Sequence, residues 1–216
     1  MPVAAGVKPR RETSGAGKAR VGTLAVMNAL REAQALPEVL LIGGRSGAGK
    51  TCVGLEVAAR LRAADVGHAL IEGDVLDAVH PAPPDDPDRS RLTTRNLAAL
   101  WANYAALGCR RLVYTNTASV LGSEERIFTA ALGSPRLTRV LLTAADATVE
   151  QRLTARERGS ELARQLRRSA HMARHLDAGV PSGTHRVATD GRTVGEVATA
   201  VLRATGWLPD AVAVGG

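Results

Sequence analysis

Five short apolar runs divide the chain, and glycine or polar residues bound each of them. Runs of about four to eight apolar residues are typical of strands that are buried on both faces of a sheet. The pattern therefore predicts strands at residues 39–42, 68–71, 112–115, 140–143 and 186–189.

Between these runs, apolar residues recur every three or four positions, which is the spacing of an amphipathic helix. Glycine is favoured just past a helix C-terminus, so Gly108 is expected to end one of these helices. Strands that alternate with helices indicate an α/β fold, in which helices cover both faces of a parallel sheet. Helices are predicted over 22–35, 50–64, about 97–107, 123–132, 146–177 and from 194 onward.

The ends of the chain and one internal segment lack this periodicity. Residues 1–20 carry five cations against a single acid, Glu12, and are rich in Gly, Ala and Pro. The segment 81–90 holds four prolines and is predicted to be a loop. We expect a flexible basic tail at 1–21, a folded domain at 22–210 and a flexible C-terminus at 211–216.

The composition of the 216-residue chain excludes several classes of protein. It is 45% hydrophobic, which is enough for a buried core. No apolar run reaches the roughly 18 residues of a membrane-spanning helix, so no membrane association is expected. Two cysteines, Cys52 and Cys109, cannot form a disulfide framework or a four-ligand zinc site. We expect Cys52 in the core and a structural role for Cys109. Because no signal peptide is evident, we expect a cytoplasmic protein.

The net charge is +7, but it does not indicate a nucleic-acid partner. Only 2% of the residues are aromatic, so stacking platforms for single strands are scarce. We expect a monomer or homodimer that acts on a small molecule. Most of the basic residues are arginines, 25 of the 28, and Lys50 is the one lysine after Arg20.

Lys50 belongs to a glycine-rich segment, residues 43–51, with the sequence GGRSGAGKT. It fits the pattern G-x-x-x-x-G-K-[ST], with a predicted strand before it and a predicted helix after it. Glycines let successive N–H groups point at phosphate oxygens, Lys50 reaches the outer phosphates, and the Thr51 hydroxyl holds Mg²⁺. ATP and Mg²⁺ are therefore predicted. Nucleotide contacts are expected from Gly44, Arg45, Ser46, Gly47, Ala48, Gly49, Lys50, Thr51 and Cys52.

Asp74 follows the second predicted strand, and ligands of open parallel sheets bind beyond the carboxyl ends of the strands. We therefore expect Asp74 in the same crevice, where it would orient or deprotonate an acceptor hydroxyl, or hold Mg²⁺. Glu72 could serve in its place as a substrate contact. After the third predicted strand, Asn116 and Thr117 offer hydrogen bonds to substrate but no carboxylate. The metal would thus rely on Thr51, the phosphates and Asp74.

Four further motifs accompany the glycine-rich segment: IEGD at 71–74, DRSRLTTRNL at 88–97, VEQRLTARE at 149–157 and DGRT at 190–193. With these motifs the chain resembles the small P-loop kinases, a group that includes adenylylsulfate kinase, gluconate kinase, chloramphenicol phosphotransferase and the nucleoside monophosphate kinases. The resemblance implies a three-layer P-loop NTPase sandwich, with a five-stranded parallel sheet and helices on both faces. It also implies a small arginine-rich helical lid at about 150–178.

Two of these motifs imply contacts to ATP. VEQRLTARE resembles a lid pattern whose arginines close over the transferring phosphate, which suggests Arg152 and Arg156 as catalytic residues, with Arg158 beside them. DGRT resembles the loop that wraps the adenine, which suggests Arg192 as a nucleotide contact. The later arginines of the lid, and the pair His171 and His175, are expected on the surface.

DRSRLTTRNL resembles a substrate-contacting stretch, which suggests Arg91, Arg95 and Asn96 at the acceptor. We predict transfer of the ATP γ-phosphoryl group to the hydroxyl of a metabolite or antibiotic, with Lys50 and Asp74 as catalytic residues. Three alternatives remain open. A nucleoside monophosphate kinase would bind its phosphate acceptor through Arg91 and Arg95. A non-catalytic ATP-binding regulator or resistance protein would bind nucleotide without releasing ADP, and a nucleic-acid-associated ATPase would hydrolyse ATP when stimulated by DNA or RNA.

Overall fold

The computed structural model describes residues 36–156 and 161–209. The predictions for the basic tail, for a helix over 22–35, for Arg158 and for the C-terminal segment lie outside these residues. The strands are β1 (Glu38–Gly43), β2 (Ala69–Glu72), β3 (Arg111–Thr115), β4 (Arg136–Thr143) and β5 (His185–Ala188). The α-helices are α2 (Lys50–Ala63), α3 (Ser90–Ala106), α4 (Glu125–Leu132), α5 (Asp146–Arg156), α6 (Glu161–Gly179) and α7 (Val194–Thr205), and the 3₁₀ turns are η1 (Gly73–Val75) and η2 (Gly122–Glu124).

All five strands are parallel and form one sheet in the order β2-β3-β1-β4-β5. Every predicted strand is present, four of them within one residue of the expected bounds, while β4 begins four residues earlier than expected; this confirms the prediction of a five-stranded parallel sheet. The chain leaves β1 toward β2 on one side and returns to β4 on the other, so the strand order reverses at β1. Ligands of open α/β sheets bind beyond the carboxyl end of such a strand.

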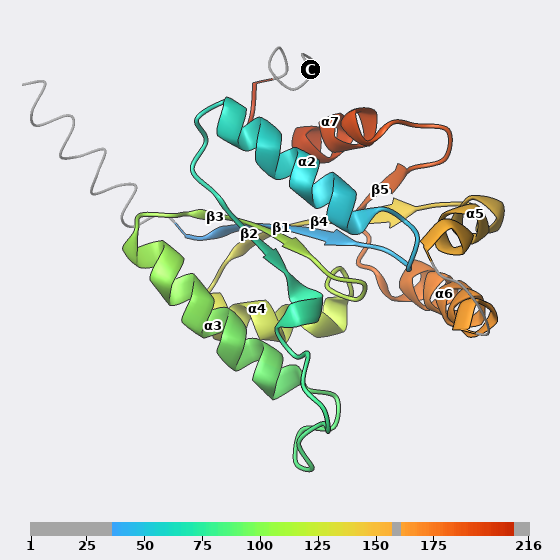
Figure 1. Cartoon of the computed structure of the whole chain (residues 1–216). Helices are drawn as coiled ribbons and strands as arrows, with labels where there is room; N and C mark the ends of the chain where they lie inside the picture. Colours follow the sequence, from blue (N-terminus) through green and yellow to red (C-terminus); the bar gives the residue numbers. More distant parts are fainter. Residues whose placement is uncertain (1–35, 157–160, 210–216) are drawn as a thin grey trace, which may run out of the picture. The chain divides into compact units, whose positions relative to one another are not determined.

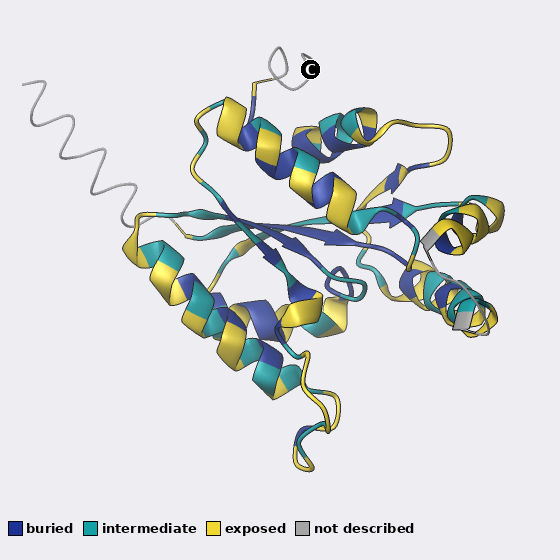
Figure 2. Ribbon diagram, in the orientation of Figure 1, coloured by how far each residue is buried: buried dark blue, intermediate teal, exposed yellow. Residues whose placement is uncertain are grey.

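Helices cover both faces of the sheet, as Figure 1 shows. On one face, Leu40 and Ile42 of β1 contact a buried cluster that includes Val57 of α2 and Val201 of α7. On the other face, Val39 and Leu41 alternate into a second cluster with side chains of α3 and α4. Figure 2 shows the resulting pattern, with the strands buried and the outer helix surfaces exposed. This alternation along β1 gives the three layers of the fold.

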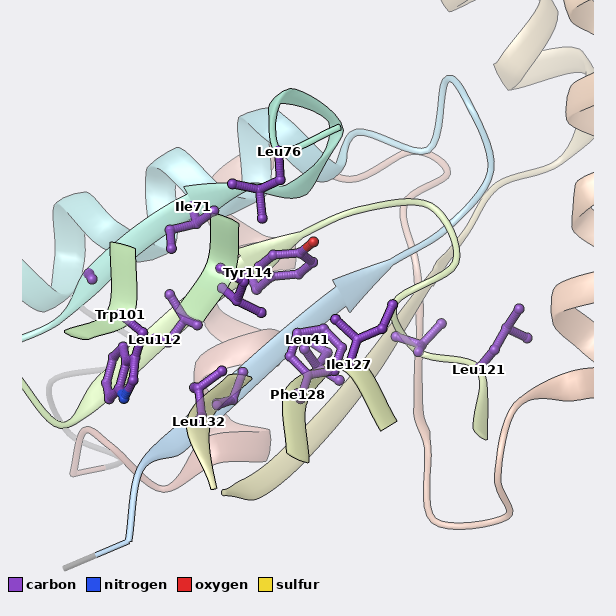
Figure 3. Packing of buried hydrophobic residues seen from close by; sticks show 14 of the residues in the cluster. Leu41, Ile71, Leu76, Trp101, Leu112, Tyr114, Leu121, Ile127, Phe128 and Leu132 are labelled. Atoms are coloured by element: carbon purple, nitrogen blue, oxygen red, sulfur yellow. The ribbon is translucent and has the colours of Figure 1, made fainter. Parts of the chain in front are cut away.

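The second cluster holds most of the large aromatic side chains (Figure 3). Trp101 of α3 is buried in it, and the rings of Tyr114 and Phe128 meet edge to face with centroids 5.0 Å apart. Edge-to-face pairs of this kind contribute about 0.5–1.5 kcal/mol beyond the burial of their area. Because Tyr114 ends β3 and Phe128 lies in α4, the pair fixes α4 under the carboxyl end of the sheet.

The helix predictions are largely confirmed. Gly108 follows α3 with a φ of 84°, the left-handed backbone that a glycine after a helix supplies without strain. The region predicted as one helix over 146–177 contains two separate helices, α5 and α6. The prediction that Cys52 lies in the core is wrong: Cys52 is exposed, because α2 turns Val53 and Val57 inward instead. Cys109 is half-buried.

No helix within residues 36–156 and 161–209 combines the length and the apolar character that crossing a bilayer requires.

Candidate functional site

The glycine-rich segment forms a tight loop between β1 and α2. Gly44, Gly47 and Gly49 have φ angles of 145°, 85° and 95°, which residues other than glycine rarely adopt. A Cβ on Gly44 would also lie only 2.7 Å from the backbone oxygen of Leu142. The loop is fastened by the Gly44 N–H, which donates to the Thr117 oxygen at 3.2 Å, and by the Ala48 N–H, which donates to the Arg45 oxygen at 3.1 Å.

The loop leads directly into the N-terminus of α2, and Gly49 caps that helix without a side-chain hydrogen bond. The first N–H groups of the helix are thus open to an anion, which the helix dipole also favours. The Lys50 ammonium lies over the loop, 3.4 Å from the Arg45 oxygen. A cavity of about 290 Å³, the phosphate pocket, opens here and is lined by Ser46, Gly47, Gly49, Lys50, Thr51, Cys52, Asp74, Thr117, Leu153 and Gln165.

A second cavity of about 330 Å³, the apolar pocket, adjoins the phosphate pocket through Gly47, Gly49 and Cys52. Its remaining lining is Ala48, Val53, Arg152, Ala155, Thr189, Arg192, Val194 and Val197. The Arg152 guanidinium donates to the Gly47 oxygen at 3.1 Å and to the Thr189 hydroxyl at 2.9 Å. Arg152 therefore joins α5 to the loop and to the end of β5, and it lines the apolar pocket rather than the phosphate pocket.

Arg192 lies on the other side of the apolar pocket, in the turn before α7. Its guanidinium donates to the backbone oxygens of Ala188 at 3.1 Å and Glu196 at 2.8 Å. The turn is stabilised by a capping box, in which Thr193 and Glu196 each bond the backbone N–H of the other. These bonds lower the pKa of Glu196 and hold Arg192 at the pocket rim. Two arginines thus border an otherwise apolar cavity.

Asp74 is brought to the phosphate pocket by η1, immediately after β2. The Asn116 side-chain amide, beyond the neighbouring β3, donates to the Asp74 carboxylate at 2.7 Å. The Asn116 oxygen accepts from the Ala118 N–H at 2.9 Å, which fixes the orientation of the amide. No carboxylate follows β3 directly at this site. Asp74, which follows β2, supplies one instead, and Asn116 holds it in place.

The side chains present fit a magnesium ion. Thr51 and Asp74 line the same pocket, and Mg²⁺ is usually held by one or two protein oxygens together with substrate phosphates. In the part of the chain that the structure describes, no three His, Cys, Asp or Glu side chains gather into a metal site of their own. The ion would depend on Thr51, Asp74 and the phosphates, as the sequence predicts. His171 and His175 are both exposed.

A third cavity of about 260 Å³, the acidic pocket, lies beyond β2 and β3. It is lined by Gly73, Asp77, Asp88, Ser90, Thr93, Tyr114, Asn116, Ala118, Ser119, Glu124, Arg126, Ile127 and Phe128. Burial, followed by the charges of Asp74, Asp77 and Glu124, raises the pKa of Tyr114, so its hydroxyl stays protonated. Asp74 lines the phosphate pocket and its partner Asn116 lines the acidic pocket, so their hydrogen bond stands at the boundary of the two.

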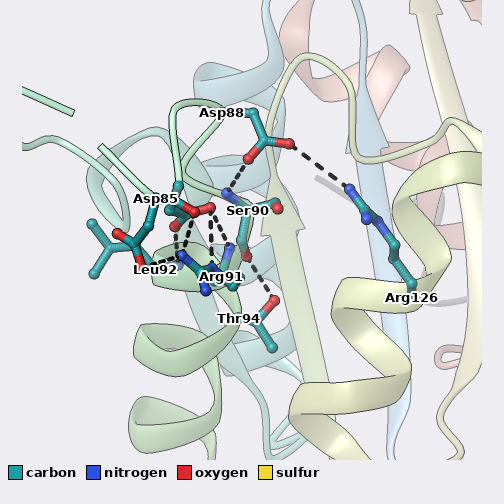
Figure 4. A network of polar contacts seen from close by, with 8 residues as sticks. Asp85, Asp88, Ser90, Arg91, Leu92, Thr94 and Arg126 are labelled. Atoms are coloured by element: carbon teal, nitrogen blue, oxygen red, sulfur yellow. Dashed lines mark hydrogen bonds and ion pairs between the residues drawn. The ribbon is translucent and has the colours of Figure 1, made fainter. Parts of the chain in front are cut away.

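The motif at 88–97 contributes Asp88, Ser90 and Thr93 to the acidic pocket, but the three residues that the resemblance suggested at the acceptor do not line it. Arg91 forms ion pairs with Asp85 at 2.5 Å and with Asp86 at 3.8 Å, within the proline-rich loop (Figure 4). Arg95 is exposed, and the Asn96 amide donates to the Leu76 oxygen at 2.6 Å. Neither these three residues nor the half-buried Glu72 lines any of the three pockets defined above.

The contacts of α6 with the loop were not expected from the sequence, and the Arg45 side chain does not line the phosphate pocket where a nucleotide contact was predicted. The Arg45 side chain is buried and turns away from the phosphate pocket, where its guanidinium donates to the Ser169 hydroxyl at 2.9 Å and pairs with Asp146. Ser169 of α6 donates in turn to the Ser46 oxygen at 2.9 Å. A neighbouring cavity is lined by Ser46, Thr117, Gln165, Arg168, Ser169 and Met172. Arg168 thus borders the loop, whereas Arg156 is the last residue of α5.

No family model matches this sequence, and no curated protein matches it. Solved structures do match. A gluconokinase from Sinorhizobium meliloti is 20% identical with a TM-score of 0.51, and the match covers 80% of this chain and 94% of that one. The APS kinase CysC of Mycobacterium tuberculosis, in complex with AMPPNP and APS, is also 20% identical with a TM-score of 0.51, over 78% of this chain and 97% of that one.

A tunicamycin resistance protein from Deinococcus radiodurans is 19% identical with a TM-score of 0.52, over 79% of this chain and 96% of that one. These similarities span nearly the whole of each solved chain. At such identities they establish the fold and nothing finer, because function depends on the residues of the site. The predicted fold class, a three-layer P-loop sandwich with a five-stranded parallel sheet, is confirmed.

Proposed function

We propose that this chain transfers the γ-phosphoryl group of ATP, with Mg²⁺, to a hydroxyl group of a small molecule. The observation that carries the proposal is the position of Asp74, which lines the phosphate pocket and is bonded at 2.7 Å to Asn116 of the acidic pocket. A carboxylate between an anion site and a polar cavity is what a general base for hydroxyl phosphorylation requires.

The nucleotide would occupy the phosphate and apolar pockets, which are continuous around the loop. Loop N–H groups, the N-terminus of α2 and Lys50 would bind the phosphates. The adenine would enter the apolar pocket between Arg152 and Arg192, because guanidinium planes stack well on aromatic rings. Thr51 would hold Mg²⁺ directly and Asp74 would reach it only through a water, which leaves the carboxylate able to accept a proton; the ion would supply positive charge to the β- and γ-phosphates.

In the transfer itself, the acceptor hydroxyl approaches from the acidic pocket. Its oxygen forms the new bond to the γ-phosphorus, and the bond from that phosphorus to the bridging oxygen breaks to leave ADP. Asp74 accepts the hydroxyl proton, and Asn116 keeps the carboxylate oriented toward the acceptor. Lys50 neutralises the charge that develops on the phosphoryl oxygens. Arg156 and Arg168, on the helices nearest the loop, are candidates for additional neutralising charge.

Two features favour this function over the alternatives. A phosphate acceptor, as in a nucleoside monophosphate kinase, would need Arg91 and Arg95, but Arg91 is paired with Asp85 and Asp86 and neither arginine lines the acidic pocket. A non-catalytic ATP-binding protein would not need a held carboxylate beside the phosphates. Asp74, held by Asn116, is such a group.

The test is release of ADP from ATP and Mg²⁺ across nucleoside monophosphates, sugars, aminoglycosides and amphenicols, alongside binding of a fluorescent ATP analogue. The proposal expects ADP release that depends on a hydroxyl acceptor. Nucleotide binding without ADP release on any acceptor would instead identify a non-catalytic protein. Turnover confined to nucleoside monophosphates would identify the other kinase class.

A further inference from the structure

The acidic pocket has an uneven balance of charge. Three carboxylates, Asp77, Asp88 and Glu124, line it against a single guanidinium, Arg126. Arg126 lies 4.0 Å from Asp88, as Figure 4 shows. Among the residues that the structure describes, neither Asp77 nor Glu124 has an ion-pair partner. The Ser90 N–H lowers the pKa of Asp88, which keeps that carboxylate ionised at neutral pH.

This balance bears on the charge of the acceptor. A carboxylate or phosphate placed beside Asp77 and Glu124 would be repelled at short range. A protonated amine in the same place would supply the missing partner. The pocket is thus complementary to a cation, although the net charge of the whole chain is +7.

The Tyr114 hydroxyl is a second and independent feature of the pocket. Only 3% of the Tyr114 surface is exposed, and within the described residues its hydroxyl makes no hydrogen bond. A Cβ on Gly73 would come within 2.2 Å of the hydroxyl oxygen, so the glycine leaves room for it. Figure 3 shows the oxygen at the edge of the aromatic cluster, pointing away from Phe128. Tyr114 lines the cavity, where a bound hydroxyl compound can provide a hydrogen-bond partner for its hydroxyl.

The size and walls of the cavity narrow the ligand further. Its volume of about 260 Å³ is below the roughly 300–1,000 Å³ of pockets for drug-sized ligands, which suits a single substituted ring. Ser90, Thr93 and Ser119 add hydroxyl groups to the wall, while Ile127 and Phe128 offer an apolar face to ring carbons. A ring seated there reaches the boundary with the phosphate pocket at Asn116.

We infer that the acceptor is a polyhydroxylated ring that carries a protonated amine, such as an amino sugar or aminocyclitol. The inference rests on the proposed function, because it names the acceptor of that reaction. The amine pairs with Asp77 and Glu124. The Tyr114 hydroxyl bonds a ring hydroxyl, and another ring hydroxyl faces Asp74 for transfer.

Matched probes test the charge requirement. Glucosamine, glucose and gluconate share a six-carbon skeleton and differ in charge, and 2-deoxystreptamine adds a second amine. The inference expects kcat/KM of the full chain, with ATP and Mg²⁺, to be about tenfold or more higher for glucosamine than for glucose, and lowest for gluconate. Glucose or gluconate as the best acceptor would overturn the inference and leave the proposed function standing.

Paired variants test which carboxylates act. We expect Glu124→Gln and Asp77→Asn each to lower kcat/KM for the amine probes about tenfold, and so to reduce the preference for glucosamine over glucose. Glu125→Gln is the control, because Glu125 adjoins Glu124 but pairs with Arg139 outside the pocket, at 2.6 Å. Equal effects of Glu124→Gln and Glu125→Gln would contradict a local role for Glu124.

Ligand-observed NMR with the same probes separates the assignment of the acidic pocket to an amine ligand from the proposed phosphoryl transfer. Glucosamine binding that Glu124→Gln weakens, without ADP release on any probe, would support the pocket assignment and reject phosphoryl transfer. Absence of glucosamine and 2-deoxystreptamine binding would reject the assignment whether or not other acceptors are phosphorylated. The measurement needs no turnover, so it gives a result in either case.

Discussion

The phosphate pocket and the acidic pocket meet at one hydrogen bond, yet they are built in opposite ways. The first is made largely by one continuous loop, whose backbone N–H groups, glycine angles and Lys50 favour an anion. The second is assembled from side chains of η1, α3, β3, η2 and α4, and it favours a cation. In the proposed reaction, backbone geometry binds the phosphates of the nucleotide, while side chains from several elements select the acceptor.

Lys50 gives the largest expected effect, because it tests the anion side of the comparison. Lys50→Arg keeps the charge, but a planar guanidinium cannot replace a compact ammonium on a flexible stem between the phosphates. We expect kcat to fall about 100-fold or more, which is about 2.7 kcal/mol of transition-state stabilisation. Steady-state ADP release measures it, with the melting temperature as a check on folding. Full activity would show that the position needs only a positive charge.

Asp74 tests the boundary between the two pockets. Asp74→Asn should lower kcat for a hydroxyl acceptor roughly 100-fold, because an amide cannot accept the proton. The matched control is the double variant Asp74→Asn with Asn116→Asp, which returns one carboxylate to the same hydrogen-bonded pair. Partial recovery would show that the pair needs one acid on either side. An active Asp74→Asn enzyme would contradict the assignment of Asp74 as the base.

The glycines of the loop test whether backbone shape alone makes the anion site. Gly44→Ala adds a Cβ 2.7 Å from the Leu142 oxygen at a φ of 145°, whereas a Cβ on Gly49 meets nothing within 4 Å. We expect Gly49→Ala to cost about 1 kcal/mol of stability from backbone strain, and Gly44→Ala about 2–4 kcal/mol with loss of nucleotide binding. Chemical denaturation and titration with a fluorescent ATP analogue measure the two effects. Equal costs would mean that the contact with Leu142 relaxes freely.

Ser169 tests how far the loop depends on α6. Ser169→Ala removes a buried hydroxyl that accepts from Arg45 and donates to the Ser46 oxygen. The unfolding free energy should fall by about 1–2 kcal/mol, because the Arg45 N–H loses its buried partner. Ser123→Ala on η2 serves as the control, because that hydroxyl is exposed. A loss no larger than that control would show that α6 is not fastened through this bond.

The smallest expected effect concerns the charge of the acidic pocket and its pH dependence. The pKa of Asp88 is below its ordinary value of 3.8 in the folded chain, mainly through the Ser90 N–H, so the folded state binds protons less readily than the unfolded state. The stability that Asp88 adds over Asn is thus complete at neutral pH and disappears as the pH falls through the lowered pKa. Urea midpoints of the parent and Asp88→Asn at pH 7, 5, 4 and 3 should converge only at the acidic end. A gap that does not change with pH would rule out this ionised contact.

The same contrast explains what the sequence predicts well. The loop is a contiguous motif between a strand and a helix, so GGRSGAGKT identifies its place and its ligand class before any tertiary contact is known. The strands and helices follow from periodicity for the same local reason. Asp74 was also placed at the phosphates from its position alone, because the carboxyl ends of parallel strands share one edge of the sheet.

What depends on tertiary packing was not foreseen. The acidic pocket joins Asp77, Tyr114 and Glu124, which are separated by tens of residues and meet only because β2 lies beside β3 and α4 packs beneath them. The motif around Arg91 was misleading for a related reason. Acids in the preceding loop pair with Arg91, and a linear pattern does not show that competition.

The scarcity of lysine has a practical consequence. Reductive methylation with ¹³C-formaldehyde labels amines and keeps their charge, and this chain has three lysine amines, of which Lys50 alone belongs to the described residues. Its signal in a proton–carbon spectrum is assigned by the Lys50→Arg variant. One resonance would then follow, in solution and in real time, each arrival and departure of phosphate at the loop.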